Sequence, residues 1–187
     1  LSVGERNAHL FALRESLSGG VINGFVRCPV CREALEFSET VSAILENYQP
    51  PASREGRIEA AGCTIRYRLL DSRDLAAASE RHGVEQARGE LIRRSVIDSH
   101  HGETALPAAE IPADAVGALA DAVAHADPLS ETRIALACAE CGHVWKAGLN
   151  IVTILWAEIE VRAKRLLHDV QLIAREYGWS ERDILAM

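Results

Sequence analysis

The sequence predicts an α+β protein, in which a small antiparallel sheet carries a helical insertion and is followed by a long C-terminal helix. Two Cys-x-x-Cys motifs each lie between short runs of β-forming residues, the layout of a zinc ribbon split into two halves. A mainly helical stretch separates the motifs, and an unbroken apolar periodicity follows the second one. The 187 residues suffice to bury a core, and we expect one domain, 1–187.

The first ribbon half is expected at residues 21–37. A short helix, Val3 to Ser16, precedes it and stops at the cluster Ser18-Gly19-Gly20. The apolar, β-branched run Val21 to Val26 leads into the first cysteine pair, and Ala34 to Phe37 leads out of it. This pattern predicts a hairpin whose turn holds the cysteines.

The middle of the chain predicts one more strand and a mainly helical insertion, 71–126. Cys63 to Leu70 alternates apolar and basic residues, which favours a half-buried strand, and we expect it to join the ribbon sheet. Helices are expected from Arg73 to about Arg81, from Gly83 to about Ser99, and from Pro112 to Ala126; loops are expected at 49–57 and 100–111.

The second ribbon half is expected at residues 132–149, and two C-terminal helices at 151–177 and 181–187. The longer helix is predicted by apolar residues spaced alternately four and three apart, which we call the apolar seam. Asn150 can cap its start and Gly178 suits its end. The seam consists of Val152, Trp156, Ile159, Ala163, Leu166, Val170, Ile173 and Tyr177.

Four cysteines form the candidate metal site: Cys28 with Cys31, and Cys138 with Cys141. Each Cys-x-x-Cys turn presents two thiolates to one ion, and two such turns complete the tetrahedral shell of structural zinc. A catalytic zinc keeps one coordination position open. Four cysteine ligands therefore predict one structural Zn²⁺, with no catalytic residue and no enzymatic activity.

The surroundings of the site agree with a metal knuckle. Gly142 suits the tight backbone after the second pair, and Arg27, Arg32 and Lys146 are placed to offset the two negative charges of a zinc tetrathiolate. The separation of the pairs by residues 32–137 is unusual, because compact fingers have roughly 15 to 20 residues there.

Other roles for the cysteines and histidines remain possible interpretations of the sequence. Two disulfides would require an oxidising compartment, and a thioredoxin-like redox pair would leave the second motif unexplained. Cys63 is expected to be a small buried apolar residue. His143 could replace a cysteine ligand, and the adjacent His100 and His101 are expected to point apart rather than share a metal.

Composition limits the possible partners. The net charge is −7, and the 20 basic residues are scattered among 27 acidic ones, which argues against nucleic acid or an anionic membrane as a partner. No stretch offers the roughly 20 apolar residues of a membrane span, and the N-terminus does not resemble a secretory signal, so we expect a cytoplasmic protein. No phosphate loop, nucleophile elbow or His-Glu-x-x-His motif occurs in the sequence.

Several motifs, taken in order, resemble a known family. They are Cys28-Pro29-Val30-Cys31, Ile65-Arg66-Tyr67-Arg68-Leu69, Ser72-Arg73-Asp74-Leu75, the run from Cys138 to Trp145, Trp156-Ala157-Glu158-Ile159, and the closing Tyr177-Gly178-Trp179-Ser180-Glu181 to Met187. The order resembles the baseplate-hub and tail-assembly proteins of T-even-type phages, which occur in phage tails and phage-derived contractile injection systems. The resemblance spans nearly the whole chain.

The resemblance implies a non-enzymatic structural or chaperone-like assembly protein of a contractile tail baseplate. Its partners would be other baseplate, tail or tape-measure proteins, and it would be found in the cytoplasm or incorporated in an assembled phage-like particle. The alternative is a zinc-ribbon regulator that binds nucleic acid, since many ribbons do so. The acidic net charge disfavours this alternative.

Overall fold

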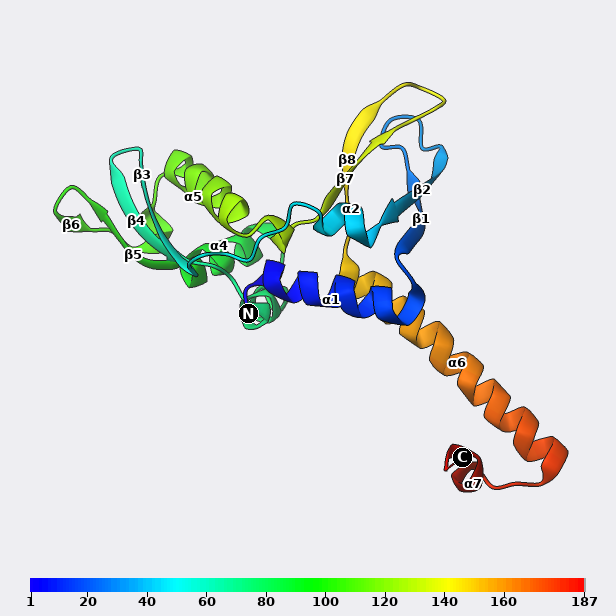
Figure 1. Ribbon diagram of the computed structural model, residues 1–187. Coiled ribbons are helices and arrows are strands. Elements are labelled where there is room, and N and C mark those ends of the chain that lie inside the picture. The colour runs from blue at the N-terminus through cyan, green and yellow to red at the C-terminus, as the bar shows by residue number, and fades with distance from the viewer. Residues whose placement is uncertain (187) are drawn as a thin grey trace. The chain divides into compact units, whose positions relative to one another are not determined.

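The computed structural model describes residues 1–186 and confirms the α+β class (Figure 1). Met187, the last residue of the predicted helix 181–187, lies outside the described residues. The elements are α1 Val3–Ser18, β1 Val21–Arg27, β2 Ala34–Thr40, α2 Val41–Leu45, β3 Glu55–Ala60, β4 Cys63–Arg68, α3 Ser72–Ser79, α4 Val84–Ser95, β5 Val96–His101, β6 Thr104–Ala105, η1 Ala108–Glu110, α5 Ala113–Ala126, η2 Pro128–Ser130, β7 Arg133–Ala137, β8 Val144–Gly148, α6 Ile151–Tyr177 and α7 Glu181–Leu185.

The chain divides into two compact units, Leu1–Leu149 and Asn150–Met187. The physical reason lies in α6. A helix of 27 residues satisfies its backbone hydrogen bonds internally, and the Asn150 side chain caps it by accepting hydrogen bonds from the amides of Val152 and Thr153. The second unit therefore needs no strand from the first.

The first unit contains three separate antiparallel sheets. β1 pairs with β2, β7 pairs with β8, and the strands β3, β4, β5 and β6 form a four-stranded sheet in that order. The prediction that the strand beginning at Cys63 joins the ribbon sheet is therefore wrong. That strand, β4, is occupied on both edges by β3 and β5, so no edge remains for a ribbon strand.

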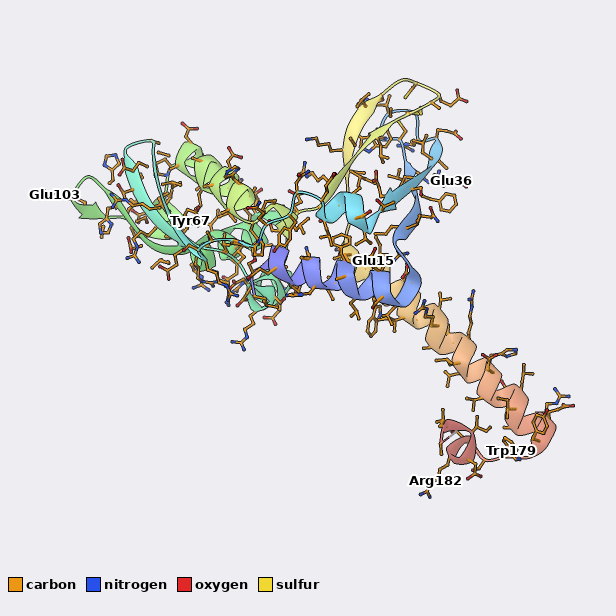
Figure 2. The ribbon with its side chains drawn as sticks, viewed as in Figure 1. Glu15, Glu36, Tyr67, Glu103, Trp179 and Arg182 are labelled. Carbon is orange, nitrogen blue, oxygen red and sulfur yellow. The ribbon has the colours of Figure 1, made fainter. Side chains whose placement is uncertain are left out.

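The four-stranded sheet packs against α5, and this contact forms the main core. The inward side chains of β4 and the residue that follows it meet one face of α5, with Tyr67 lying between the sheet and the helix (Figure 2). Cys63 belongs to this core, as predicted. The buried members are Cys63, Ile65, Tyr67, Leu69, Ile111, Ala115 and Leu119.

Three elements of the first unit differ from the sequence expectations. The helix expected to reach about Ser99 ends at Ser95, because Val96 and the next residues pair with β4 as strand β5. The expected loop 49–57 already contains the start of β3, and the loop 100–111 contains β6 and η1. Each misassigned strand is short and is stabilised by its sheet neighbours rather than by its own composition.

Helix α1 is fixed to the end of α5 by one buried carboxylate. Asp127 accepts hydrogen bonds from the Ser2 hydroxyl at 3.0 Å and from the Gly4 amide at 2.9 Å. A β-carbon on Gly4 would lie 2.0 Å from the Asp127 Oδ1, so only glycine fits. The negative charge also lies at the positive end of the α1 dipole, which is a favourable placement.

Two further buried carboxylates accept hydrogen bonds from arginines: Asp74 joins α3 to the sheet, and Glu90 binds arginines within and just before α4. Asp74 accepts two 2.8 Å hydrogen bonds from Arg68 of β4, and Glu90 accepts hydrogen bonds from Arg81, Arg93 and Arg94. The Arg68 hydrogen bonds are the main cause that lowers the pKa of Asp74 to about 2, although burial opposes the shift. The arginine partners thus compensate the cost of burying each carboxylate.

The second unit consists of α6 and α7. Gly178 ends α6 in the left-handed conformation, with φ 67°, and its amide donates to the Ala174 carbonyl. Trp179 then lies against Tyr177, with ring centroids 5.4 Å apart, near the end of α6 (Figure 2). Within residues 1–186, no helix is both long and apolar enough to cross a membrane.

Candidate metal centre

The four predicted ligands lie in the turns of two hairpins. In the first hairpin, Arg27 pairs with Ala34, and the turn between them holds the first cysteine pair. In the second, Ala137 pairs with Val144, and the turn between them holds the second pair. Each register places the first cysteine of a pair directly after a strand, so the strand ends fix the positions of both cysteine turns.

The backbone of the two knuckles is hydrogen-bonded in the same way. In the first knuckle, the Cys28 amide donates to the Glu33 carbonyl at 2.9 Å, and the Arg32 amide donates to the Cys28 carbonyl at 3.0 Å. The second knuckle repeats both bonds. There, the Cys138 amide donates to the His143 carbonyl and the Gly142 amide to the Cys138 carbonyl, each at 2.9 Å. The two turns are local repeats of one structure.

The structure brings the four sulfur atoms together across the hairpins. The Cys28 and Cys141 sulfurs are 3.6 Å apart, the Cys31 and Cys138 sulfurs are 3.5 Å apart, and all four lie within 4.8 Å of one another. A zinc–sulfur bond of about 2.3 Å in a tetrahedron requires sulfurs roughly 3.8 Å apart. A disulfide would require about 2.05 Å. The four cysteines are therefore positioned to hold one metal ion, and the spacing is compatible with zinc.

Burial divides the ligands in the same way in both knuckles. Cys28 and Cys138, the first cysteine of each pair, are buried, whereas Cys31 and Cys141 are exposed. The centre thus has one protected side and one side open to solvent.

Hydrogen bonds prepare one sulfur to carry negative charge. Burial alone would raise the pKa of Cys28, but backbone hydrogen bonds at Cys31 and Val30 and a hydrogen bond with Cys141 lower this pKa to about 6. A backbone hydrogen bond at Glu33 would lower the pKa of Cys31, but partial desolvation of its sulfur and hydrogen bonds with the neighbouring thiols raise it instead. Four sulfurs this close cannot all ionise without a cation between them, so the arrangement favours a divalent metal.

Two of the predicted basic residues, Arg27 and Lys146, have different surroundings in the structure. Arg27 reaches the first knuckle, where its guanidinium donates to the Arg32 carbonyl at 3.5 Å. Lys146 lies on β8 opposite Ala135 and lines a surface cleft of about 570 Å³ beside α2 and η2.

The histidines considered as ligands have other neighbours. The His143 ring stacks on Trp145 with centroids 5.8 Å apart and planes 14° apart, while its carbonyl serves the second knuckle. His100 and His101 are consecutive residues of β5, and the His100 Nδ1 lies 3.8 Å from Asp98. The His143–Trp145 stack was missed in the sequence, because His143 lies in the knuckle turn just before β8, where strand alternation does not assign the faces of side chains.

No protein-family model matches the chain, and no curated protein or solved structure matches it either.

Proposed function

We propose that the four-cysteine centre holds one structural Zn²⁺ and that the protein has no catalytic role at this centre. The observation that carries the proposal is the set of four sulfurs, from two knuckles of identical backbone geometry, all within 4.8 Å of one another. Four thiolates occupy every position of a tetrahedral zinc ion, so no position is left for water or substrate. Such a centre supplies folding free energy rather than chemistry.

The task of this metal would be to join two hairpins that share no sheet. Within residues 1–186, β1 pairs only with β2, and β7 only with β8. Two-stranded hairpins are marginally stable alone in water. The zinc–sulfur bonds would therefore provide the rigid connection that a continuous ladder provides in other small sheets.

Metal analysis of the purified protein tests this proposal. We expect one zinc per chain by mass spectrometry, and a large fall in thermal stability after chelation that is reversed when Zn²⁺ is restored. Alkylation of the metal-loaded protein should spare the four ligand cysteines and label them after chelation. A metal-free protein of unchanged stability, or thiols that react freely when metal is present, would contradict a structural zinc.

We further propose that the protein is a structural or assembly component of a phage-like contractile tail baseplate. The support is the order of motifs, from the first knuckle to the closing Tyr177-Gly178-Trp179-Ser180-Glu181 segment, which resembles that family. The closed metal centre and the net charge of −7 agree with a protein that binds other proteins rather than nucleic acid.

Affinity purification from cells that carry the complete gene cluster tests this assignment. We expect baseplate, tail or tape-measure proteins to co-purify with the metal-loaded protein from the cytoplasm or from assembled particles. Recovery of none of these proteins would count against the assignment. A salt-dependent shift of DNA or RNA at physiological ionic strength would favour a nucleic-acid regulator instead.

A further inference from the structure

Helix α6 leaves much of its apolar seam exposed to solvent. Trp156 is 68% exposed, Leu166 is 65% exposed and Tyr177 is 66% exposed. A helix in a protein is stabilised mainly by packing of its apolar face, and a contiguous exposed apolar surface marks an interaction site. The exposed part of the seam is therefore a candidate interaction surface.

We propose that the seam of α6 pairs antiparallel with the seam of α6 in a second copy of this chain, forming a two-helix coiled coil. The seam steps alternate four and three residues, a mean of 3.5, which is the spacing that keeps two supercoiled helices in contact. Its first and last members, Val152 and Tyr177, lie at the two ends of the helix. The 27 residues give a contact about 40 Å long.

The seam is complementary to itself in the antiparallel direction. Overlaying two helices about the midpoint between Lys164 and Arg165 brings every seam position opposite another seam position of different size. Large and small side chains facing each other are what close packing of a layered interface requires. The resulting layers are Val152 with Tyr177, Trp156 with Ile173, Ile159 with Val170, and Ala163 with Leu166, each occurring twice by symmetry.

A parallel pair fits much less well. In that arrangement each seam residue faces its own copy, so Trp156 would meet Trp156 while Ala163 would meet Ala163. The first layer would be overpacked and the second would contain a void, and both defects destabilise an interface. A parallel pair would also bring both first units to the same end of the helices, because each first unit ends at Leu149, directly before Asn150.

Charge placement supports the same register. Arg162 and Asp169 flank the seam on one side, directly before Ala163 and Val170. In the antiparallel register, Arg162 of one copy faces Asp169 of the other, and the symmetry gives two such ion pairs. Opposite charges at the flanking positions are what sets partner and orientation in coiled coils. In a parallel pair, Arg162 would face Leu167, which offers no charge.

The aromatic layers alone supply a substantial part of the area that a specific dimer buries. Burying two-thirds of a large aromatic side chain removes roughly 100 to 170 Å² from water, and the pair contains two copies each of Trp156 and Tyr177. Leu166 and the other aliphatic layers add to this area along about 40 Å. A standard specific interface needs about 1,200 to 2,000 Å² in total.

Molar mass in solution is the first test. Light scattering and sedimentation of the metal-loaded full chain should give twice the 20.4 kDa of one chain. Leu166→Glu places charges in the central layers and should give a monomer with unchanged zinc content. Leu172→Glu is the matched control, because Leu172 is also exposed but lies off the seam, and this variant should remain a dimer. A wild-type monomer at every concentration, with the seam covered by the chain's own first unit, would overturn the proposal.

The charge pair and the orientation give two further tests. Arg162→Glu should weaken dimerisation at least about tenfold, because it faces Asp169 of the second copy, and the double variant Arg162→Glu with Asp169→Arg should restore it. Under mild oxidation, Val152→Cys protein mixed with Tyr177→Cys protein should form a disulfide-linked heterodimer. A disulfide within Val152→Cys protein alone would show a parallel pair and overturn the register.

Discussion

Arg32 and Gly142 occupy the same position in the two metal knuckles, and both have a left-handed backbone, with φ of 63° and 70°. Their amides donate to the carbonyls of Cys28 and Cys138 respectively. The left-handed conformation is therefore imposed by the hydrogen-bonded turn, whichever residue occupies this position. Glycine adopts this conformation without strain, whereas a side chain costs about 1–2 kcal/mol there. The first knuckle therefore carries strain that the second does not.

Replacement of Arg32 by glycine should relieve this strain. We expect Arg32→Gly to be about 1 kcal/mol more stable than Arg32→Ala, because both remove the same charge but only alanine retains a β-carbon. The reverse change in the second knuckle, Gly142→Ala, should destabilise by about 1–2 kcal/mol. Denaturant unfolding of the zinc-loaded proteins measures both differences. Equal stability of the two Arg32 variants would contradict strain at this turn.

Substitution of single cysteines should distinguish the four candidate metal ligands from Cys63, which lies in the core. We expect Cys141→Ser to lose bound zinc and to lower Tm by at least about 5–10 °C, because three thiolates hold the ion more weakly and the hairpins lose their connection. Cys63→Ala, in the core of the four-stranded sheet, should keep one zinc per chain and cost about 1 kcal/mol. Retention of full zinc content by Cys141→Ser would remove this residue from the ligand set.

Gly4 should tolerate no side chain. Because a β-carbon would lie 2.0 Å from the Asp127 Oδ1 and 3.0 Å from the Ser130 amide nitrogen, Gly4→Ala should separate α1 from the end of α5. We expect a loss of roughly 2–4 kcal/mol in the free energy of unfolding. Gly117→Ala is the matched control, since Gly117 lies within α5 with open space around it, and it should stabilise by about 0.5–1 kcal/mol.

Acid should destabilise the fold through Asp74. Its pKa is lowered to about 2 from an ordinary 3.8, so the stabilisation is complete above pH about 4 and is lost as the pH falls toward 2. Asp74→Asn should remove on the order of 2 kcal/mol at neutral pH and flatten the dependence of stability on pH in this range. Urea unfolding of both proteins between pH 2 and pH 5 provides the comparison, because any metal bound by the cysteines would be released from both proteins alike. If the free energies of unfolding of the two proteins changed with pH in parallel, Asp74 would be excluded as the source of the acid sensitivity.

Local signals predicted the helices well, and α6 is the clearest case. Its observed bounds, Ile151–Tyr177, are those predicted, because Asn150 and Gly178 supply the two caps and the seam supplies the period. The two hairpins also followed from local patterns around the cysteine pairs. Each of these features depends on residues within one or two turns of one another.

Features that depend on distant residues could not be predicted in the same way. The partner of β4 is decided by which strands offer a matching edge, and nothing in Cys63 to Arg68 distinguishes β5 from a ribbon strand. The hydrogen bond from the Gly4 amide to the Asp127 carboxylate could not be predicted from local patterns, because the two residues are 123 residues apart. The approach of Cys31 to Cys138 was predictable only because zinc requires four ligands and each turn offers two.

The distance along the chain between the two knuckles has a consequence for biosynthesis. Cys31 and Cys138 are 107 residues apart, which corresponds to roughly 5 to 20 s of translation. During that interval the first thiol pair has left the ribosome without its complement, and the four-stranded sheet and its helices can already fold. A metal ion would be fully enclosed only after that intervening part is complete, so metal capture would close the first unit as a late step. A ribosome stalled before residue 138 would leave a nascent chain with two unprotected thiols.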